Sequence, residues 1–179
     1  MKRGRRQTSG DAAESLKFRD ATVDDVPVIA GLQNAAAGAL TARFGVGHWS
    51  SLVTERSATV AQRHARVRLG RLGNRIVTVV RLTTKKPWAI DVSHFTPVKR
   101  PLYLTGLAVS VAHQGRGLGK LAMEDACAVA WNSPADAIRL DAYDSPAGAG
   151  DFYVKCGFKE RGRVLYRDDP LVYYELLLE

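Results

Sequence analysis

The fold of this chain is constrained most by a strand-like run, a glycine-rich loop and an amphipathic helix that follow one another between residues 101 and 131. Residues 101–111 are rich in aliphatic and β-branched side chains. Gly106 inside this run indicates a bulge, or a place where another backbone or a ligand comes close. Residues 118–131 carry apolar side chains at helical spacing. Residues 137–143 then predict a buried strand parallel to the first, because the helix between them supplies the crossover that a parallel pair needs.

The segments on either side of this unit predict further strands and helices. A strand is expected over residues 16–21, followed by capping side chains and Pro27, which begin a helix that ends near Gly45. The other expected elements are a highly charged helix over 49–68, a turn at 70–74, a strand over 75–82, a returning strand over 88–95, a short helix over 151–155 and a hairpin of 163–167 with 171–178. Together these elements predict an α+β fold with a mixed sheet.

A length of 179 residues favours one compact domain. We assign it to residues 16–179 and interpret residues 1–15 as a flexible basic arm. No apolar stretch approaches the roughly 20 residues that a bilayer requires, so no membrane partner is expected. The basic first residues lack the apolar segment of a secretory signal, which predicts a cytoplasmic protein. Cys127 and Cys156 form no metal-binding or redox motif, so reduced thiols and no metal are expected.

The glycine-rich loop between the strand and the helix can bind an anion. Its residues are Gln114, Gly115, Arg116, Gly117, Leu118, Gly119 and Lys120. The main-chain N–H groups of such a loop converge with the helix dipole on a negative charge. Arg116 and Lys120 either neutralise phosphates there or remain solvated at the start of the helix. The loop matches neither GxxxxGK[ST] nor GxGxxG, because Gln114, Lys120 and Leu121 stand where those motifs need other residues.

The same loop fits the pattern Q-x-x-G-x-G through Gln114, Gly117 and Gly119, and residues 151–158 (DFYVKCGF) fit F/L-Y-x-K-x-G-F. In this order the two motifs resemble those of the GNAT superfamily of acyl-CoA-dependent N-acyltransferases, over about residues 17–179. The resemblance implies a three-layer α+β fold in which helices flank a central mixed, splayed β-sheet. It also implies an acyltransferase that moves an acetyl group from acetyl-CoA to a primary amine of a small molecule or protein, directly within a ternary complex, and releases coenzyme A.

The resemblance further implies which residues hold the donor. The backbone amides of the loop, residues 114–120, would bind the pyrophosphate of coenzyme A, and Leu107, Ala108 and Val109 on the preceding strand would bind the pantetheine arm. Many relatives carry an asparagine seven positions before the tyrosine, but Pro146 stands there. The hydrogen bond of that asparagine is therefore absent or replaced, and the backbone of residues 148–150 is a candidate for its replacement. A homodimer is common in families of this type, although no segment specifies an interface.

Acyl transfer from a thioester to an amine needs a proton for the leaving thiolate, a base for the amine and a polarised carbonyl. Tyr153 fits the acid, although a packing role for this aromatic is the alternative. The candidates for the base are Asp141, Tyr143, Asp91, His94 and Asp144, and a buried Asp141 bonded to backbone is also considered. The bulge at Gly106 implies that the sheet opens beside it, which exposes the N–H groups of residues 107–109 to the thioester oxygen. Trp49 and Trp88 are candidates for an acceptor pocket.

Two rival functions belong to other classes. The formal charge of +8 suits a polyanion, and the arm with the basic cluster at residues 63–75 would serve a nucleic-acid-binding module. That reading lacks aromatic stacking motifs or a helix-turn-helix pattern and leaves both glycine motifs without a role, so nucleic acid is not the expected partner. The second rival is a GNAT-like domain that binds acyl-CoA as a sensor without turnover.

Overall fold

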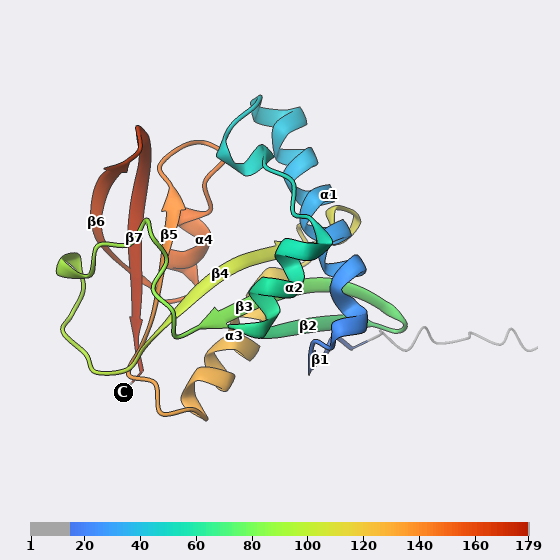
Figure 1. Ribbon diagram of the computed structural model, residues 1–179, viewed down its shortest axis with the longest axis horizontal. Helices are drawn as coiled ribbons and strands as arrows, with labels where there is room; N and C mark the ends of the chain where they lie inside the picture. The colour runs from blue at the N-terminus through green and yellow to red at the C-terminus, as the bar shows by residue number, and fades with distance from the viewer. Residues whose placement is uncertain (1–14, 179) are drawn as a thin grey trace, which may run out of the picture.

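The computed structural model describes residues 15–178, and its centre is a mixed seven-stranded sheet in the order β1-β2-β3-β4-β5-β7-β6 (Figure 1). The strands are β1 Lys17–Asp20, β2 Arg66–Leu72, β3 Arg75–Thr83, β4 Pro101–Val109, β5 Ala137–Tyr143, β6 Lys159–Tyr166 and β7 Asp169–Leu177. All neighbours are antiparallel except β4 and β5, which are parallel as expected from the helix that joins them. The predicted α+β mixed sheet is confirmed. The basic arm predicted over residues 1–15 lies outside the described residues, except for its last position.

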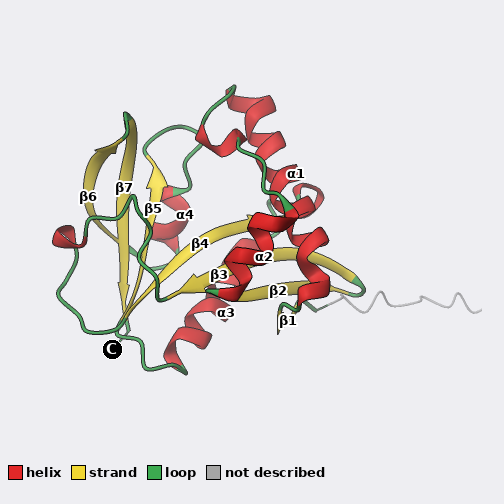
Figure 2. Ribbon diagram, in the orientation of Figure 1, coloured by secondary structure: helices red, strands yellow, loops and turns green. Residues whose placement is uncertain are grey.

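Helices cover both faces of the sheet (Figure 2). They are α1 Val26–Phe44, α2 Glu55–Arg63, α3 Leu118–Trp131 and α4 Gly150–Lys155. Val79 on β3 packs with Ile29 of α1, whereas the next residue, Val80, packs with Met123 of α3. Since successive side chains of a strand point to opposite faces, α1 lies on one face and α3 on the other. Helix α4 shares the face of α3 through Tyr153.

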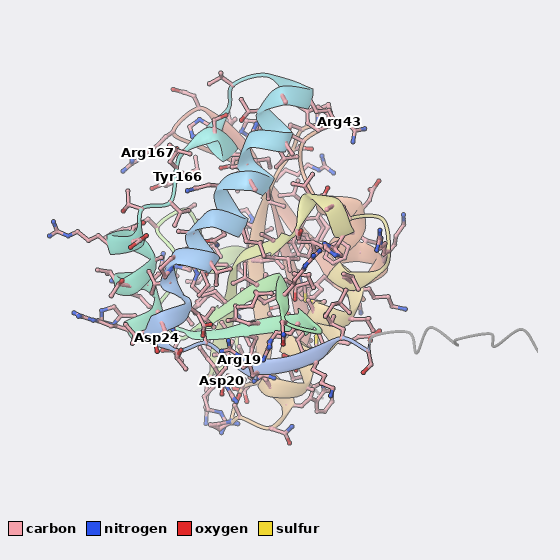
Figure 3. The ribbon with its side chains drawn as sticks, turned by 90° about the vertical axis from the view of Figure 1, so that its right-hand side faces the viewer. Arg19, Asp20, Asp24, Arg43, Tyr166 and Arg167 are labelled. Carbon is pink, nitrogen blue, oxygen red and sulfur yellow. The ribbon has the colours of Figure 1, made fainter. Side chains whose placement is uncertain are left out.

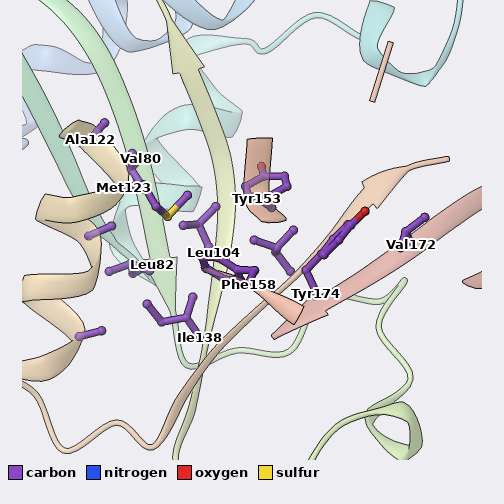
Figure 4. Packing of buried hydrophobic residues seen from close by; sticks show 13 residues of the cluster. Val80, Leu82, Leu104, Ala122, Met123, Ile138, Tyr153, Phe158, Val172 and Tyr174 are labelled. Carbon is purple, nitrogen blue, oxygen red and sulfur yellow. The ribbon is translucent and has the colours of Figure 1, made fainter. Parts of the chain in front are cut away.

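The larger part of the core lies between the sheet and α3 with α4 (Figure 4). Its buried members come from four strands, both helices and the turn after α4: Val80, Leu82, Leu104, Ala122, Met123, Ala126, Ala130, Ile138, Leu140, Tyr153, Phe158, Val172 and Tyr174. Burial of these side chains is the main favourable term that holds α3 and α4 on the sheet. No helix within residues 15–178 is both long and apolar enough to cross a membrane.

An ion pair fixes the chain where it enters α1. The Asp25 carboxylate accepts hydrogen bonds from both Nη atoms of Arg19, at 2.7 and 2.6 Å, and from the backbone N–H of Thr22 at 2.7 Å. The Arg19 guanidinium holds the pKa of Asp25 far below its usual range. Figure 3 shows Arg19 and Asp20 on β1 beneath the N-terminal end of α1. The helix therefore begins where its sequence predicts.

Two predictions for residues 49–95 are wrong. In the segment expected as one helix over 49–68, the α-helix is limited to α2, Glu55–Arg63. The last residues of the segment, from Arg66, already belong to strand β2. In β2, the buried residues Val67 and Leu69 alternate with arginines. The charged residues hid the alternation of buried and exposed side chains that is typical of a strand. Residues 88–95 form a loop with a short 3-10 helix and not a returning strand. Both edges of β3 are already occupied by β2 and β4, so no partner remains beside it for such a strand.

The sheet opens between β4 and β5, as the sequence predicts. The two strands pair only at Pro101↔Ala137, Leu102↔Ile138 and Tyr103↔Arg139, and diverge beyond that point. On the other side of β4, the register with β3 shifts so that Gly106 and Leu107 lie opposite a single β3 residue, and Gly106 has a φ of 67°. This positive φ is the bulge expected at that glycine.

Candidate active site

A cavity of about 510 Å³ opens where β4 ends and α3 begins. It is lined by β4, the loop after it, the first turn of α3, one side of α1 and the helix α4. Of the residues that the sequence singled out, those in the lining are Leu107, Ala108, Val109, Gln114, Gly115, Gly117, Leu118, Gly119 and Lys120. The structure therefore brings nearly all the predicted donor-binding residues to one cavity.

The glycine loop has the backbone geometry of an anion cradle. Gly115 and Gly117 have φ values of 74° and 76°, and a Cβ added at either position would meet no atom within 4 Å. Within the described chain, no backbone acceptor is bonded to the N–H groups of residues 115–120. Free N–H groups at the start of the 14-residue helix α3 form a site for a negative charge. The residues present therefore fit a pyrophosphate group.

The polar side chains of the loop lie in different places. Gln114 donates from Nε2 to the carbonyl oxygen of Val109 at 3.1 Å, which ties the loop to the end of β4. Lys120 lines the cavity, and its Nζ lies 3.8 Å from the exposed Glu124 carboxylate. Arg116 is exposed and does not belong to the cavity lining. Of the two cations named from the sequence, Lys120 is the one that faces the cavity.

The opposite walls of the cavity come from α1, which the sequence analysis did not assign to the site, and from α4, which it assigned only through Tyr153. Ala36 and Leu40, one helical turn apart, bring α1 to the cavity, and the helix α4 contributes Phe152 and Lys155. A Cβ at Gly119 would lie 3.4 Å from the Phe152 ring, so α3 and α4 pack closely there. The small side chains of residues 35–37 were the one local signal for this wall of the cavity.

Tyr153 is buried beside the cavity and is not part of its lining. Its ring packs against Phe152, Phe158 and Tyr174, with centroid distances of 5.4, 5.9 and 5.9 Å. Burial raises the pKa of its hydroxyl strongly, and the negative charge of Asp141 adds to the shift. A tyrosine in this environment keeps its proton at neutral pH and is able to donate it to a strong base.

Of the predicted bases, Asp141 and Tyr143 are partly buried at the end of β5, and burial raises the pKa of the Tyr143 hydroxyl. Burial also raises the pKa of the Asp141 carboxyl, opposed only by a hydrogen bond from its own backbone N–H. Asp91 caps the 3-10 helix that follows it, and Asp144 forms an exposed ion pair with Arg163 at 2.7 Å. The exposed His94 packs its ring edge-on against Tyr173. Asp91, His94 and Asp144 are thus exposed, whereas Asp141 and Tyr143 are partly buried.

Aromatic and charged side chains gather at the end of β5. The Trp49 ring meets Tyr143 edge-on at 5.7 Å, and His48 forms an ion-pair contact of 2.6 Å with Asp169 at the start of β7. This contact joins the segment between α1 and α2 to the β6–β7 hairpin, and the sequence analysis missed it. Trp88, the other tryptophan considered for an acceptor pocket, is 87% exposed and lies apart from this group.

Pro146 has a structural explanation. The N–H of Gly148 donates to the carbonyl oxygen of Ser145 at 2.8 Å, so Pro146 occupies the second position of a tight turn, which its fixed φ favours. A Cβ at Gly148 would lie 1.9 Å from the carbonyl oxygen of Tyr143. The turn therefore brings the backbone after β5 close to the strand that precedes it.

Comparison with known proteins agrees with this arrangement. Residues 51–158 match the model of the acetyltransferase (GNAT) family. An N-acetyltransferase from Staphylococcus aureus Mu50 is similar at 16% identity over 92% of this chain and 99% of that chain, with a TM-score of 0.67. The protein yncA from Salmonella typhimurium, a putative acetyltransferase solved with its cofactor acetyl-CoA, is similar at 15% identity over 92% of this chain and 94% of that chain, with a TM-score of 0.68.

The ribosomal-protein-S18-alanine N-acetyltransferase from Escherichia coli is similar at 14% identity over 92% of this chain and 95% of that chain, with a TM-score of 0.68. No curated protein matches the sequence. At these identities the solved structures establish the fold alone, and they confirm the three-layer arrangement that the motifs implied.

Proposed function

The chain belongs to the acetyltransferase (GNAT) family, and from this premise we propose that it transfers an acetyl group from acetyl-CoA to a primary amine, directly within a ternary complex. Members of the family acetylate amine acceptors. The observation that carries it is the cavity in which the free N–H groups of the glycine loop meet the unpaired side of β4.

The donor would be held by two sets of main-chain groups. Residues 115–120 offer N–H groups to the pyrophosphate, and the cation of Lys120 lies beside them. Beyond Tyr103, β4 has no strand partner on the side of β5, so main-chain groups of Leu107, Ala108 and Val109 along the opening are free to bind an extended amide chain. Acetyl-CoA supplies the acyl group already activated as a thioester.

Tyr153 and Asp141 are assigned to the proton transfers. Tyr153 holds a proton on its hydroxyl for the leaving sulfur; its raised pKa keeps this proton in place at neutral pH and makes the hydroxyl a weaker acid, so donation depends on contact with the developing thiolate. Asp141 receives the proton that the amine loses, because burial makes its carboxylate a stronger base than an exposed aspartate. Asp141 and Tyr153 belong to opposite faces of the sheet and would act from the two sides of the opening between β4 and β5.

The proposal is tested by calorimetric titration with acetyl-CoA. We expect the wild-type chain to bind it, and Gly117→Val to weaken binding at least about ten-fold, since the added side chain enters the cavity at the anion cradle. Gly73→Val in the β2–β3 turn is the matched control, because Gly73 also has a positive φ, 53°, and lies away from the cavity. Absence of binding by the wild-type chain would refute the proposed function.

A further inference from the structure

Arg81, Thr105 and Asp141 stand in one row across three neighbouring strands. Arg81 pairs with Thr105, and Tyr103, two residues before Thr105, pairs with Arg139. Thr105 is therefore level with Asp141, at the place where β4 and β5 have begun to separate. Alternation along the strands puts all three side chains on the face that α1 covers, because Leu104 and Leu140 point into the core on the other face.

The guanidinium of Arg81 lies over the bulge of β4. A Cβ built on Gly106 would be 2.4 Å from Nη2 of Arg81 and 2.9 Å from Nε2 of Gln33. Gln33 on α1 donates to the carbonyl oxygen of Gly106 at 3.3 Å, and Gly106 itself is exposed. The cation thus lies over the β4 bulge, between the sheet and α1, beside the strand along which β4 and β5 separate.

Arg81 has no counter-ion in the part of the chain that the structure describes. Three other arginines with little exposure pair with carboxylates: Arg68 with Asp125 at 2.7 Å, and Arg139 and Arg161 with Glu175 at 3.0 and 2.8 Å. No ion pair or side-chain hydrogen bond between residues 15 and 178 involves Arg81. Burial lowers its pKa, and no nearby carboxylate offsets this effect. A largely desolvated guanidinium without an anion is unfavourable in the free protein.

We propose that Arg81 binds a carboxylate of the acceptor, so that the acceptor is an amino acid whose free amine is acetylated. This inference rests on the proposed function. A guanidinium presents two parallel N–H donors that match a carboxylate, and desolvation strengthens that contact. Asp141 in the same row lies on the other side of β4, so the carboxylate and the amine of one small molecule are received on the two sides of the bulge. Arg81 does not line the donor cavity, so the phosphates of coenzyme A are not its partner.

The test compares acceptors that differ only in the carboxylate. The twenty L-amino acids and their α-amides are supplied with acetyl-CoA, and release of the coenzyme A thiol is followed. For the amino acid that reacts best, we expect kcat/KM to exceed that of its α-amide by about 10- to 100-fold. This is the factor that a hydrogen bond between charged groups contributes to binding. Arg81→Gln should remove this preference through a higher KM for the acid, so that the acid and its amide react at similar kcat/KM. Arg81→Lys should keep part of the preference for the acid, because lysine carries the positive charge but lacks the two parallel N–H donors of the guanidinium.

Arg75→Gln is the matched control, since Arg75 is an exposed arginine on the same strand. Thermal unfolding of each variant shows whether it is folded, and titration with acetyl-CoA tests the proposed function separately. If acetyl-CoA binds and the amides or peptides react as fast as the acids, or if Arg81→Gln keeps the preference, the inference about Arg81 is wrong and the proposed function stands. If acetyl-CoA does not bind, both are wrong.

Discussion

Arg139 on β5 and Glu175 on β7 form an ion pair in the interior, with 3.0 Å between Nε and Oε1 and side chains that are 4% and 0% exposed. The same carboxylate lies 2.8 Å from Nε of Arg161 on β6 and accepts a hydrogen bond from the N–H of Thr96 at 3.3 Å. Arg139 also donates to the carbonyl oxygen of Thr96. This network fastens the loop before β4 to three strands of the sheet.

Removal of the negative charge from this network should be costly. In Glu175→Gln the buried cation of Arg139 loses its partner, so we expect the free energy of unfolding to fall by about 3–5 kcal/mol. Glu160→Gln is the control, because Glu160 pairs with the exposed Arg163 and should cost less than about 1 kcal/mol. Urea unfolding measures both values. Equal losses in the two variants would contradict the view that burial decides the contribution of these pairs.

Gly106→Ala should disturb the bulge and the side chains above it. The substitution places a Cβ in a left-handed conformation, which costs about 1–2 kcal/mol, and pushes it against Arg81 and Gln33. We expect lower stability by at least that amount and a lower kcat/KM for the acceptor. Gly38→Ala within α1, where a Cβ meets nothing within 4 Å, should instead stabilise the chain by about 0.5–1 kcal/mol. A stable and fully active Gly106→Ala variant would show that the bulge tolerates a side chain.

Asp141→Asn should separate activity from stability. Burial raises the folded-state pKa of Asp141, so its carboxylate is disfavoured by folding. The favourable contribution of this group is complete below its unfolded pKa and is lost as the pH rises through the higher folded value. The variant should therefore be more stable than the wild type at pH 8, by a margin that shrinks as the pH falls.

The same substitution should lower kcat about 10²- to 10⁴-fold if Asp141 is the base. Asp144→Asn, at an exposed ion pair, serves as the control for both measurements. Unfolding in urea across the pH range gives the stabilities. An Asp141→Asn variant with wild-type kcat would exclude the base assignment, whatever its stability.

Tyr153→Phe keeps the packing of the ring and removes only the hydroxyl. We expect kcat to fall about 10²- to 10⁴-fold with the best amine of the acceptor panel, while the affinity for acetyl-CoA stays unchanged. Tyr166→Phe, at the end of β6, is the matched control. If both variants keep the wild-type kcat, Tyr153 is a core aromatic and no acid. A wild-type chain that binds acetyl-CoA and acetylates no amine would support the sensor alternative.

The local elements of this chain were readable from its residues because each depends on neighbours in sequence. The glycine loop and α3 are set by positive-φ glycines and by apolar spacing within one helix, and the bulge at Gly106 by the absence of a side chain. Strand β2 was missed because its arginines hide the alternation of Val67 and Leu69, which becomes visible only when β1 and β3 flank it.

The site was predictable only as far as it is local. The motifs by themselves determined the family and predicted an anion cradle at residues 114–120, since each motif is a short run of neighbouring residues. Only the tertiary structure brought α1 to the wall of the cavity, left Asp141 less exposed than Asp91 and Asp144, and set Arg81 beside Gly106 with no counter-ion among residues 15–178. Those relationships join residues tens of positions apart. They depend on strand register and burial, which no short segment encodes.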